Sequence, residues 1–182
     1  MLKKFFLTLF LLIFIFSWFG INGCGKKSPP EPGRYYNKTK GFSIKFPKGW
    51  EIFEGQTEED PVVEAVSPWE SDSDMLSEFI SIYVDELPNW MDLDDYYSEL
   101  SINSENELAH YQEEDSGTST IDDTYVKWLI FSYTVAEGAI QNISYLLFKD
   151  HQAYIITCNS EPEKFYMYKS KFEEVAQSFK FE

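Results

Sequence analysis

The sequence predicts an α+β fold, an α/β/α sandwich on a central antiparallel sheet of about seven strands in the order ββββ-α-βββ-α. Two observations predict it. Short runs of alternating apolar and polar residues, typical of half-buried strands, fill most of the chain between residues 41 and 158. Two stretches that begin at Asp92 and Ser160 instead repeat apolar residues at helical spacing, and each begins with the pattern of a capping box.

The first 23 residues have the three-part layout of a secretory signal peptide. Lys3 and Lys4 precede an apolar core from Phe5 to Phe19, and small residues follow before Cys24. The alternative is an uncleaved transmembrane anchor. Residues 5–21 would rise only about 25 Å as a helix, which is short of a bilayer core of about 30 Å. We therefore expect residues 1–23 to be removed.

The run Ile21-Asn22-Gly23-Cys24 resembles the lipobox of bacterial lipoproteins. This resemblance implies that diacylglycerol is attached to the Cys24 sulfur and that a peptidase cuts between Gly23 and Cys24. Two acyl chains, at roughly 0.8 kcal/mol for each buried CH₂, hold a protein on a membrane without a spanning helix. The alternative is an ordinary thiol at Cys24. We expect a chain anchored through this lipid to the extracytoplasmic face of a bacterial cell membrane, with no other cofactor.

Residues 24–34 are expected to form a basic, proline-rich membrane tether. Lys26 and Lys27 are followed by three prolines within four residues, a composition that favours an extended spacer. The folded domain is then expected from residue 35 to residue 182. The whole chain carries 31 acidic and 15 basic residues, a net charge of −16. Because that charge repels phosphate backbones, it excludes nucleic acid as a partner.

Four strands are expected before the first helix, at residues 41–47, 50–54, 62–66 and 79–84. An acidic loop is expected around Glu113-Glu114-Asp115, and three strands follow it at residues 125–135, 140–148 and 154–158. Glu137-Gly138 and Lys149-Asp150 lie between these three runs, where tight turns favour an antiparallel meander. The run 125–135 is apolar on both faces, so it should lie inside the sheet with cover on each side.

Two helices are expected to provide that cover. Asp92 and Asp95 can form a capping box for the first helix, which fades between Asn103 and Asn106. Ser160 and Glu163 suggest a second box, with Pro162 tolerated in the first turn. The apolar stripe of this second helix comprises Phe165, Tyr168, Phe172, Val175, Ala176 and Phe179.

The run Gly41-Phe42-Ser43-Ile44-Lys45-Phe46-Pro47-Lys48-Gly49-Trp50 resembles the opening motif of the PsbP-like domain, and Gln177-Ser178-Phe179 resembles its close. The chain is also similar to DcrB-like bacterial lipoproteins. Both resemblances imply an α/β/α sandwich. PsbP proteins are extrinsic, non-enzymatic subunits that help photosystem II to retain calcium and chloride, so the resemblance implies a non-catalytic role. It transfers no ion-handling residue to this chain.

The sequence shows no arrangement typical of catalysis. It contains no Gly-x-Ser-x-Gly, HExxH, CxxC, Walker or GxGxxG motif. The two histidines, His110 and His151, are expected at the surface. Cys158 lies in an apolar strand and is expected to be a small buried hydrophobe. Carboxylates at Asp122-Asp123 and at Asp92, Asp94 and Asp95 could hold calcium but do not match EF-hand spacing, so the metal site is left as unknown.

We therefore expect a non-catalytic, lipid-anchored extracytoplasmic module that binds or helps to assemble a protein complex in the membrane. A calcium-responsive extrinsic subunit is the alternative, motivated by the acidic loops. A secreted hydrolase is the third reading. The sequence alone identifies no ligand, partner or oligomeric state, and it does not separate an inner from an outer membrane.

Overall fold

The structure is a computed structural model that describes residues 33–70 and 76–182. The signal peptide expected at residues 1–23 lies outside the described residues, and so do Gly23, Cys24 and most of the tether. Arg34, expected at the end of the tether, begins the first strand.

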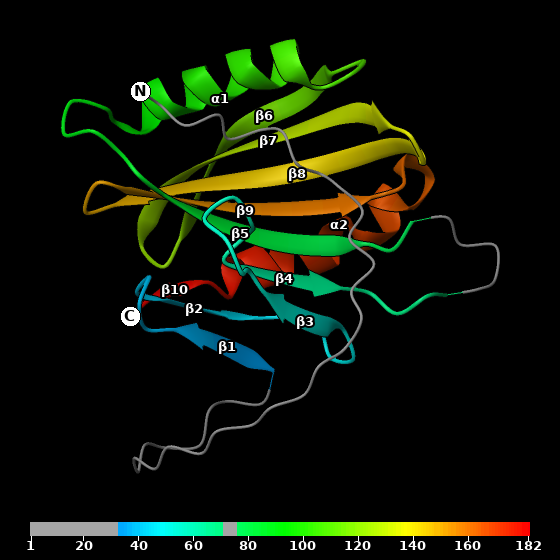
Figure 1. The fold of residues 1–182 in the computed structure, drawn as a ribbon, viewed down its shortest axis with the longest axis horizontal. Helices are drawn as coiled ribbons and strands as arrows, with labels where there is room; N and C mark the ends of the chain where they lie inside the picture. The colour runs from blue at the N-terminus through cyan, green and yellow to red at the C-terminus, as the bar shows by residue number, and fades with distance from the viewer. Residues whose placement is uncertain (1–32, 71–75) are drawn as a thin grey trace.

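The strands form two antiparallel sheets. The larger one contains seven strands: β3 (Glu51–Glu54), β4 (Val63–Val66), β5 (Phe79–Glu86), β6 (Gln112–Ile121), β7 (Thr124–Val135), β8 (Gly138–Lys149) and β9 (Gln152–Ser160). Their spatial order is β3-β4-β5-β9-β8-β7-β6 (Figure 1). The smaller sheet has the order β1-β2-β10, from β1 (Arg34–Asn37), β2 (Phe42–Lys45) and β10 (Lys180–Phe181). The predicted α+β class and the seven-stranded antiparallel sheet are confirmed.

Four strands differ from the prediction, and two of them, β1 and β10, were not expected at all. The strand expected at residues 41–47 is β2, which pairs with β1 and β10 rather than with the large sheet. The acidic loop expected around Glu113 is instead the start of β6, which pairs with β7 through a bulge between Glu113 and Asp115. A strand at the edge of a sheet needs few apolar residues, because most of its side chains face solvent. The predicted number of strands in the large sheet was therefore right, but one of the strands assigned to it was wrong and one of its strands was missed.

Two helices accompany the sheet, α1 (Leu93–Glu107) and α2 (Pro162–Gln177). The capping box of α1 is confirmed, since the Asp92 carboxylate accepts hydrogen bonds from the Asp94 and Asp95 backbone N–H groups. The box expected at Ser160 is wrong. Ser160 pairs with Gln141 as the last residue of β9, so Glu161 occupies the N-cap position without a side-chain bond. None of the helices that the structure describes is both long and apolar enough to span a bilayer.

The helices cover opposite faces of the large sheet, which makes the predicted sandwich (Figure 1). On the α2 side, buried Phe165 and Phe172 pack in one cluster with Val126 and Ile130 of β7. On the α1 side, Tyr96 packs in a second cluster with Leu129 and Phe131 of the same strand. The expectation that this run is apolar on both faces because both are covered is confirmed.

Tight turns join the four strands β6 to β9. Asp122 and Asp123 have φ values of 49° and 57°, and Asp150 and His151 have values of 51° and 58°. Two consecutive positive φ values in a two-residue loop are typical of a type I′ hairpin turn, whose twist matches that of the strands. The predicted meander is therefore present, with one strand more than expected.

Candidate functional site

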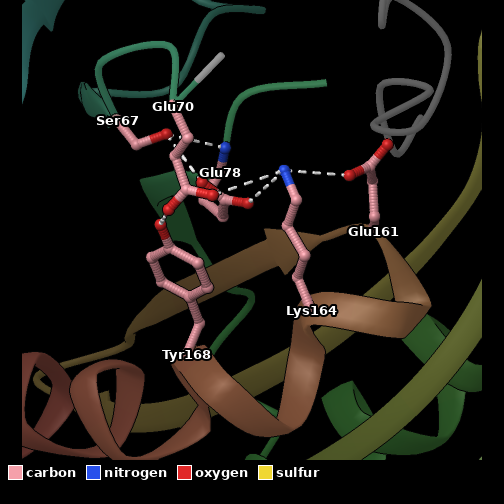
Figure 2. A network of polar contacts seen from close by, with 6 residues as sticks. All are labelled: Ser67, Glu70, Glu78, Glu161, Lys164 and Tyr168. Carbon is pink, nitrogen blue, oxygen red and sulfur yellow. Dashed lines mark hydrogen bonds and ion pairs between the residues drawn. The ribbon is translucent and has the colours of Figure 1, made fainter. Parts of the chain in front are cut away.

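A cluster of polar side chains joins the β4–β5 hairpin to the start of α2, and we call it the polar cluster (Figure 2). Its members come from three segments: Ser67 and Glu70 follow β4, Glu78 precedes β5, and Glu161, Lys164 and Tyr168 belong to the first turns of α2 and its cap. The segments lie together because α2 packs its apolar stripe across the sheet, which brings its N-terminal end over this hairpin.

Glu78 is the deepest member, with none of its surface exposed. The Ser67 hydroxyl donates a 2.8 Å hydrogen bond to Oε2 of Glu78, and the Glu78 backbone N–H donates to that hydroxyl at 3.0 Å. The Ser67 N–H also donates to the Glu78 carbonyl at 2.8 Å, so the β4–β5 pairing continues to these residues. A buried carboxylate is costly unless it is paired and hydrogen-bonded.

Lys164 provides the opposite charge. Its Nζ lies 3.0 Å from Oε2 of Glu161, 3.6 Å from Oε1 of Glu78 and 3.8 Å from Oε2 of Glu70. Oε1 of Glu78 has no hydrogen-bond partner within the part of the chain that the structure describes, so the ion pair with Lys164 is what compensates its burial. Figure 2 shows the three carboxylates around this one ammonium.

Tyr168 extends the cluster toward the surface. Its hydroxyl donates to Oε1 of Glu70, and burial together with the neighbouring carboxylates raises the pKa of the Tyr168 phenol. The phenol therefore remains a neutral donor at physiological pH. Lys171 stacks on the same ring, with Nζ 4.5 Å from its centroid, and also approaches Trp50 at 5.9 Å. The hydrogen bond from Tyr168 to Glu70 holds the segment that follows β4 against α2, while the Lys171 contact with Trp50 joins α2 to the residue before β3.

The polar cluster supports structure rather than chemistry. The Ser67 hydroxyl is buried and already donates to a carboxylate, and the Tyr168 hydroxyl is likewise engaged. Three large apolar side chains close in the sequence to members of the cluster are exposed: Trp69 is 65% exposed, Tyr166 is 76% exposed and Met167 is 71% exposed. We call these three residues the exposed apolar surface.

The residues singled out from the sequence lie elsewhere. His110 and His151 are exposed, and Cys158 is fully buried, as predicted. The Asp92 carboxylate caps α1, and the Asp122 carboxylate accepts a 3.0 Å bond from the Phe181 N–H. Among residues 33–70 and 76–182, no three His, Cys, Asp or Glu side chains come together as metal ligands. The lipidation and cleavage residues, Cys24 and Gly23, lie outside these ranges.

Sequence reasoning missed most of the polar cluster. Tyr168 was placed on the buried stripe of the last helix, which is correct, but Glu78 and Lys164 were not singled out. One local signal was present: Glu78 is a carboxylate directly before the apolar run of β5, where a charge is unusual. Its partner is 86 residues further along the chain, and only the packing of α2 brings the two together.

No family model and no curated protein matches the sequence. Solved structures do match the fold. Cyanobacterial PsbP (CyanoP) from Synechocystis is similar over 89% of this chain and 99% of its own, with a TM-score of 0.64 and 17% identity. The fold is PsbP-like. At that identity the likeness concerns the fold alone, and the resemblance read from the two ends of the domain is confirmed at that level.

Two further structures share this PsbP-like fold. LpqN of Mycobacterium tuberculosis, described as involved in cell envelope biogenesis, is similar over 82% of this chain and 85% of its own, with a TM-score of 0.56 and 11% identity. The Ran-binding protein Mog1p of Saccharomyces cerevisiae is similar over 81% of this chain and 94% of its own, with a TM-score of 0.53 and 11% identity.

Proposed function

We propose that this chain is a non-catalytic module, anchored by a lipid on Cys24 to the extracytoplasmic face of a bacterial cell membrane, that binds a protein partner and helps to assemble a membrane complex. The leader and the lipobox-like run at residues 21–24 support the address. Two of the similar structures are also consistent with it, since CyanoP is a cyanobacterial PsbP and LpqN is described as involved in cell envelope biogenesis. Mog1p, described as Ran-binding, illustrates that the same fold can bind a protein.

The observation that carries the proposal is the exposed apolar surface beside the polar cluster. Trp69 directly precedes Glu70, and Met167 directly precedes Tyr168, so the hydrogen bond between Glu70 and Tyr168 brings the two segments together. Exposed aromatic and methionine side chains are enriched at protein interfaces, and an aromatic anchor contributes most when its support is rigid. The buried ion pair of Glu78 and Lys164 provides such support.

The engaged hydroxyls of the polar cluster support a role without catalysis. A nucleophile needs both a nearby base and access to its substrate. Ser67 has a carboxylate beside it, but the residue is only 5% exposed, and its hydroxyl already donates to the Glu78 carboxylate and accepts from the Glu78 backbone N–H. The acidic loops also motivated the alternative of a calcium-responsive subunit. That alternative is not favoured, because the carboxylates of Asp92 and Asp122 already accept hydrogen bonds from backbone N–H groups.

The test is capture of a partner from membranes with the full-length anchored chain after chemical crosslinking. A variant that carries Trp69→Ser and Met167→Ser should lose the captured protein. Trp90→Ser is the matched control, because Trp90 is 71% exposed but lies in the segment before α1. A partner that is retained equally by all three chains would place the interface elsewhere. A wild-type chain that captures nothing beyond the control bait would contradict the proposed function.

A further inference from the structure

A second feature, separate from the polar cluster, is a cavity of about 260 Å³ between the C-terminal half of α2 and strands β6, β7 and β8. Its wall consists of Trp128 of β7 with Ile143 and Tyr145 of β8. Ligand pockets for drug-sized molecules occupy about 300–1,000 Å³. This cavity is smaller, and its size suits a single ring.

Two of the residues that line this cavity carry a buried hydroxyl group that has no partner in the part of the chain that the structure describes. The side chain of Tyr145 is only 4% exposed, and neither its hydroxyl nor that of Ser119 has a hydrogen-bond partner among the described residues. An unpaired buried hydroxyl is costly, and most such groups in folded proteins are satisfied. Burial raises the pKa of the Tyr145 phenol, so the group keeps its proton and can donate it. Two such hydroxyls in one cavity point to a partner other than the residues that the structure describes.

The position of Trp128 in the wall of the cavity depends on a glycine. Gly117 of β6 lies opposite Trp128, and a Cβ atom at Gly117 would come within 2.7 Å of Cζ2 of the indole. A side chain at this position would therefore push the indole out of its place. The glycine lets Trp128 lie against β6, where its ring offers an aromatic surface to whatever enters the cavity.

The rim of the cavity carries no net charge. Nζ of Lys169 lies 3.8 Å from Oε1 of Glu173, and both residues line the opening. Because these charges offset each other, the rim favours a neutral ligand over an ion. Gln177 closes one end, where its Nε2 donates a 3.3 Å hydrogen bond to the Thr120 carbonyl of β6.

From these features we infer that the cavity binds a phenol, a single neutral aromatic ring that carries a hydroxyl group. The ring lies against Trp128 and Ile143, and the phenol hydroxyl meets the hydroxyls of Tyr145 and Ser119. A phenol hydroxyl both donates and accepts, so it can accept from Tyr145 while it donates to Ser119. The phenol comes either from a free small molecule or from a tyrosine side chain of a protein. The inference does not depend on the lipid anchor or on the exposed apolar surface.

The test uses the full-length chain in lipid nanodiscs with fluorotryptophan at its tryptophans, and fluorine NMR as the readout. Substitution of Trp128 by Phe assigns its resonance. Titration with para-ethylphenol should shift the Trp128 signal saturably at millimolar concentration while the Trp90 signal stays in place. Ethylbenzene, which has the same ring without the hydroxyl, should bind about fivefold more weakly, as expected for one lost hydrogen bond.

Two variants separate the site from nonspecific partition into lipid. Tyr145→Phe keeps the ring and removes only the unpaired hydroxyl, so it should fold and bind para-ethylphenol about fivefold more weakly. Ser119→Ala should weaken binding in the same direction and provides a second reading if the first variant is poorly folded. A Trp128 signal that does not saturate, or wild-type affinity in both variants, would overturn the inference. N-acetyltyrosinamide distinguishes the sources: tighter binding than para-ethylphenol assigns a protein tyrosine, and weaker binding assigns a free phenol.

Discussion

The Ser67 hydroxyl donates a 2.8 Å hydrogen bond to the carboxylate of Glu78 and accepts one of 3.0 Å from the Glu78 backbone. This reciprocal contact ends the β4–β5 hairpin at a carboxylate with no exposed surface. The second oxygen of that carboxylate faces Lys164 at 3.6 Å, so the hairpin and α2 share one buried ion pair. The junction between the sheet and α2 therefore depends on the buried charge of Glu78, which is costly without its counter-charge on Lys164.

Substitution of Lys164 by Met should destabilise the fold by about 3 kcal/mol, because it leaves the buried Glu78 carboxylate without its counter-charge. The free energy of unfolding is measured by urea titration of the full-length chain. Lys169→Met is the matched control: it breaks a pair whose side chains are 33% and 51% exposed, and should cost about 0.5 kcal/mol or less. Addition of Glu78→Gln to Lys164→Met should recover part of the loss. Equal costs for the two lysine variants would show that Glu78 does not depend on Lys164.

Asp85 should make the fold less stable as the pH rises. Burial raises the pKa of its carboxyl above the ordinary 3.8, while a hydrogen bond from Tyr96 and the charge of Lys40 act in the opposite direction. The folded chain therefore binds this proton more tightly than the unfolded chain, and the stabilisation is lost from pH 3.8 up to the raised folded pKa. Above that pKa the contribution is level.

The measurement is the difference in unfolding free energy between the wild type and Asp85→Asn across a pH series. The unfolding free energy of Asp85→Asn should increase relative to that of the wild type as the pH rises through this window. Tyr96→Phe, which removes the bond that lowers the pKa of Asp85, should extend the window upward. A difference that does not change with pH would show that the folded and unfolded chains bind this proton equally.

Gly117→Ala should destabilise the fold by about 1–3 kcal/mol, because the added methyl group meets the Trp128 indole at 2.7 Å. Thr118→Ala is the control on the same strand, where the exposed side chain should change stability by about 0.5 kcal/mol or less. Thermal unfolding gives the stability, and the part of the tryptophan emission that Trp128→Phe removes reports the displacement of this indole among the five tryptophans. An unchanged melting temperature with an unchanged emission spectrum would mean that the indole has room to move.

The thiol of Cys158 should be unreactive in the folded chain, since it is fully buried and burial raises its pKa. The chain has two cysteines, Cys24 and Cys158, so the number of thiols that react with a reagent in urea shows whether Cys24 is free. Chain purified from membranes should show one reactive thiol if Cys24 is acylated. Cys158→Ala should then show none. Two reactive thiols in the wild type would mean that Cys24 carries no lipid.

Elements set by local pattern were predictable from the sequence. The Asp92 capping box needs only neighbours three residues apart, and the stripe of α2 from Phe165 to Ala176 repeats at helical spacing. Phe179, which was expected on the same stripe, is buried but lies beyond the end of the helix. The assignment of β2 to a separate sheet was not predictable, because alternation shows that a strand exists but not which strand it pairs with. At Ser160 the local pattern was misleading. The sequence suggests a helix cap there, but Ser160 instead pairs with β8 as the last residue of β9.

The candidate sites were less predictable than the fold. The polar cluster depends on an ion pair between residues 78 and 164, and no local pattern links those positions. The cavity depends on an edge strand that the sequence presents as an acidic loop followed by serines and threonines. Only the pairing of Gly117 with Trp128 turns that polar strand into one side of a pocket.

Mass spectrometry of the N-terminal peptide, from chain purified out of bacterial membranes, tests the proposed function most directly. A lipid-anchored module should begin at Cys24, and the peptide should carry the mass of a diacylglyceryl group on that residue. A peptide that still contains residues 1–23, or one that begins at Cys24 with a free thiol, would contradict the anchor on which the proposed address and role depend.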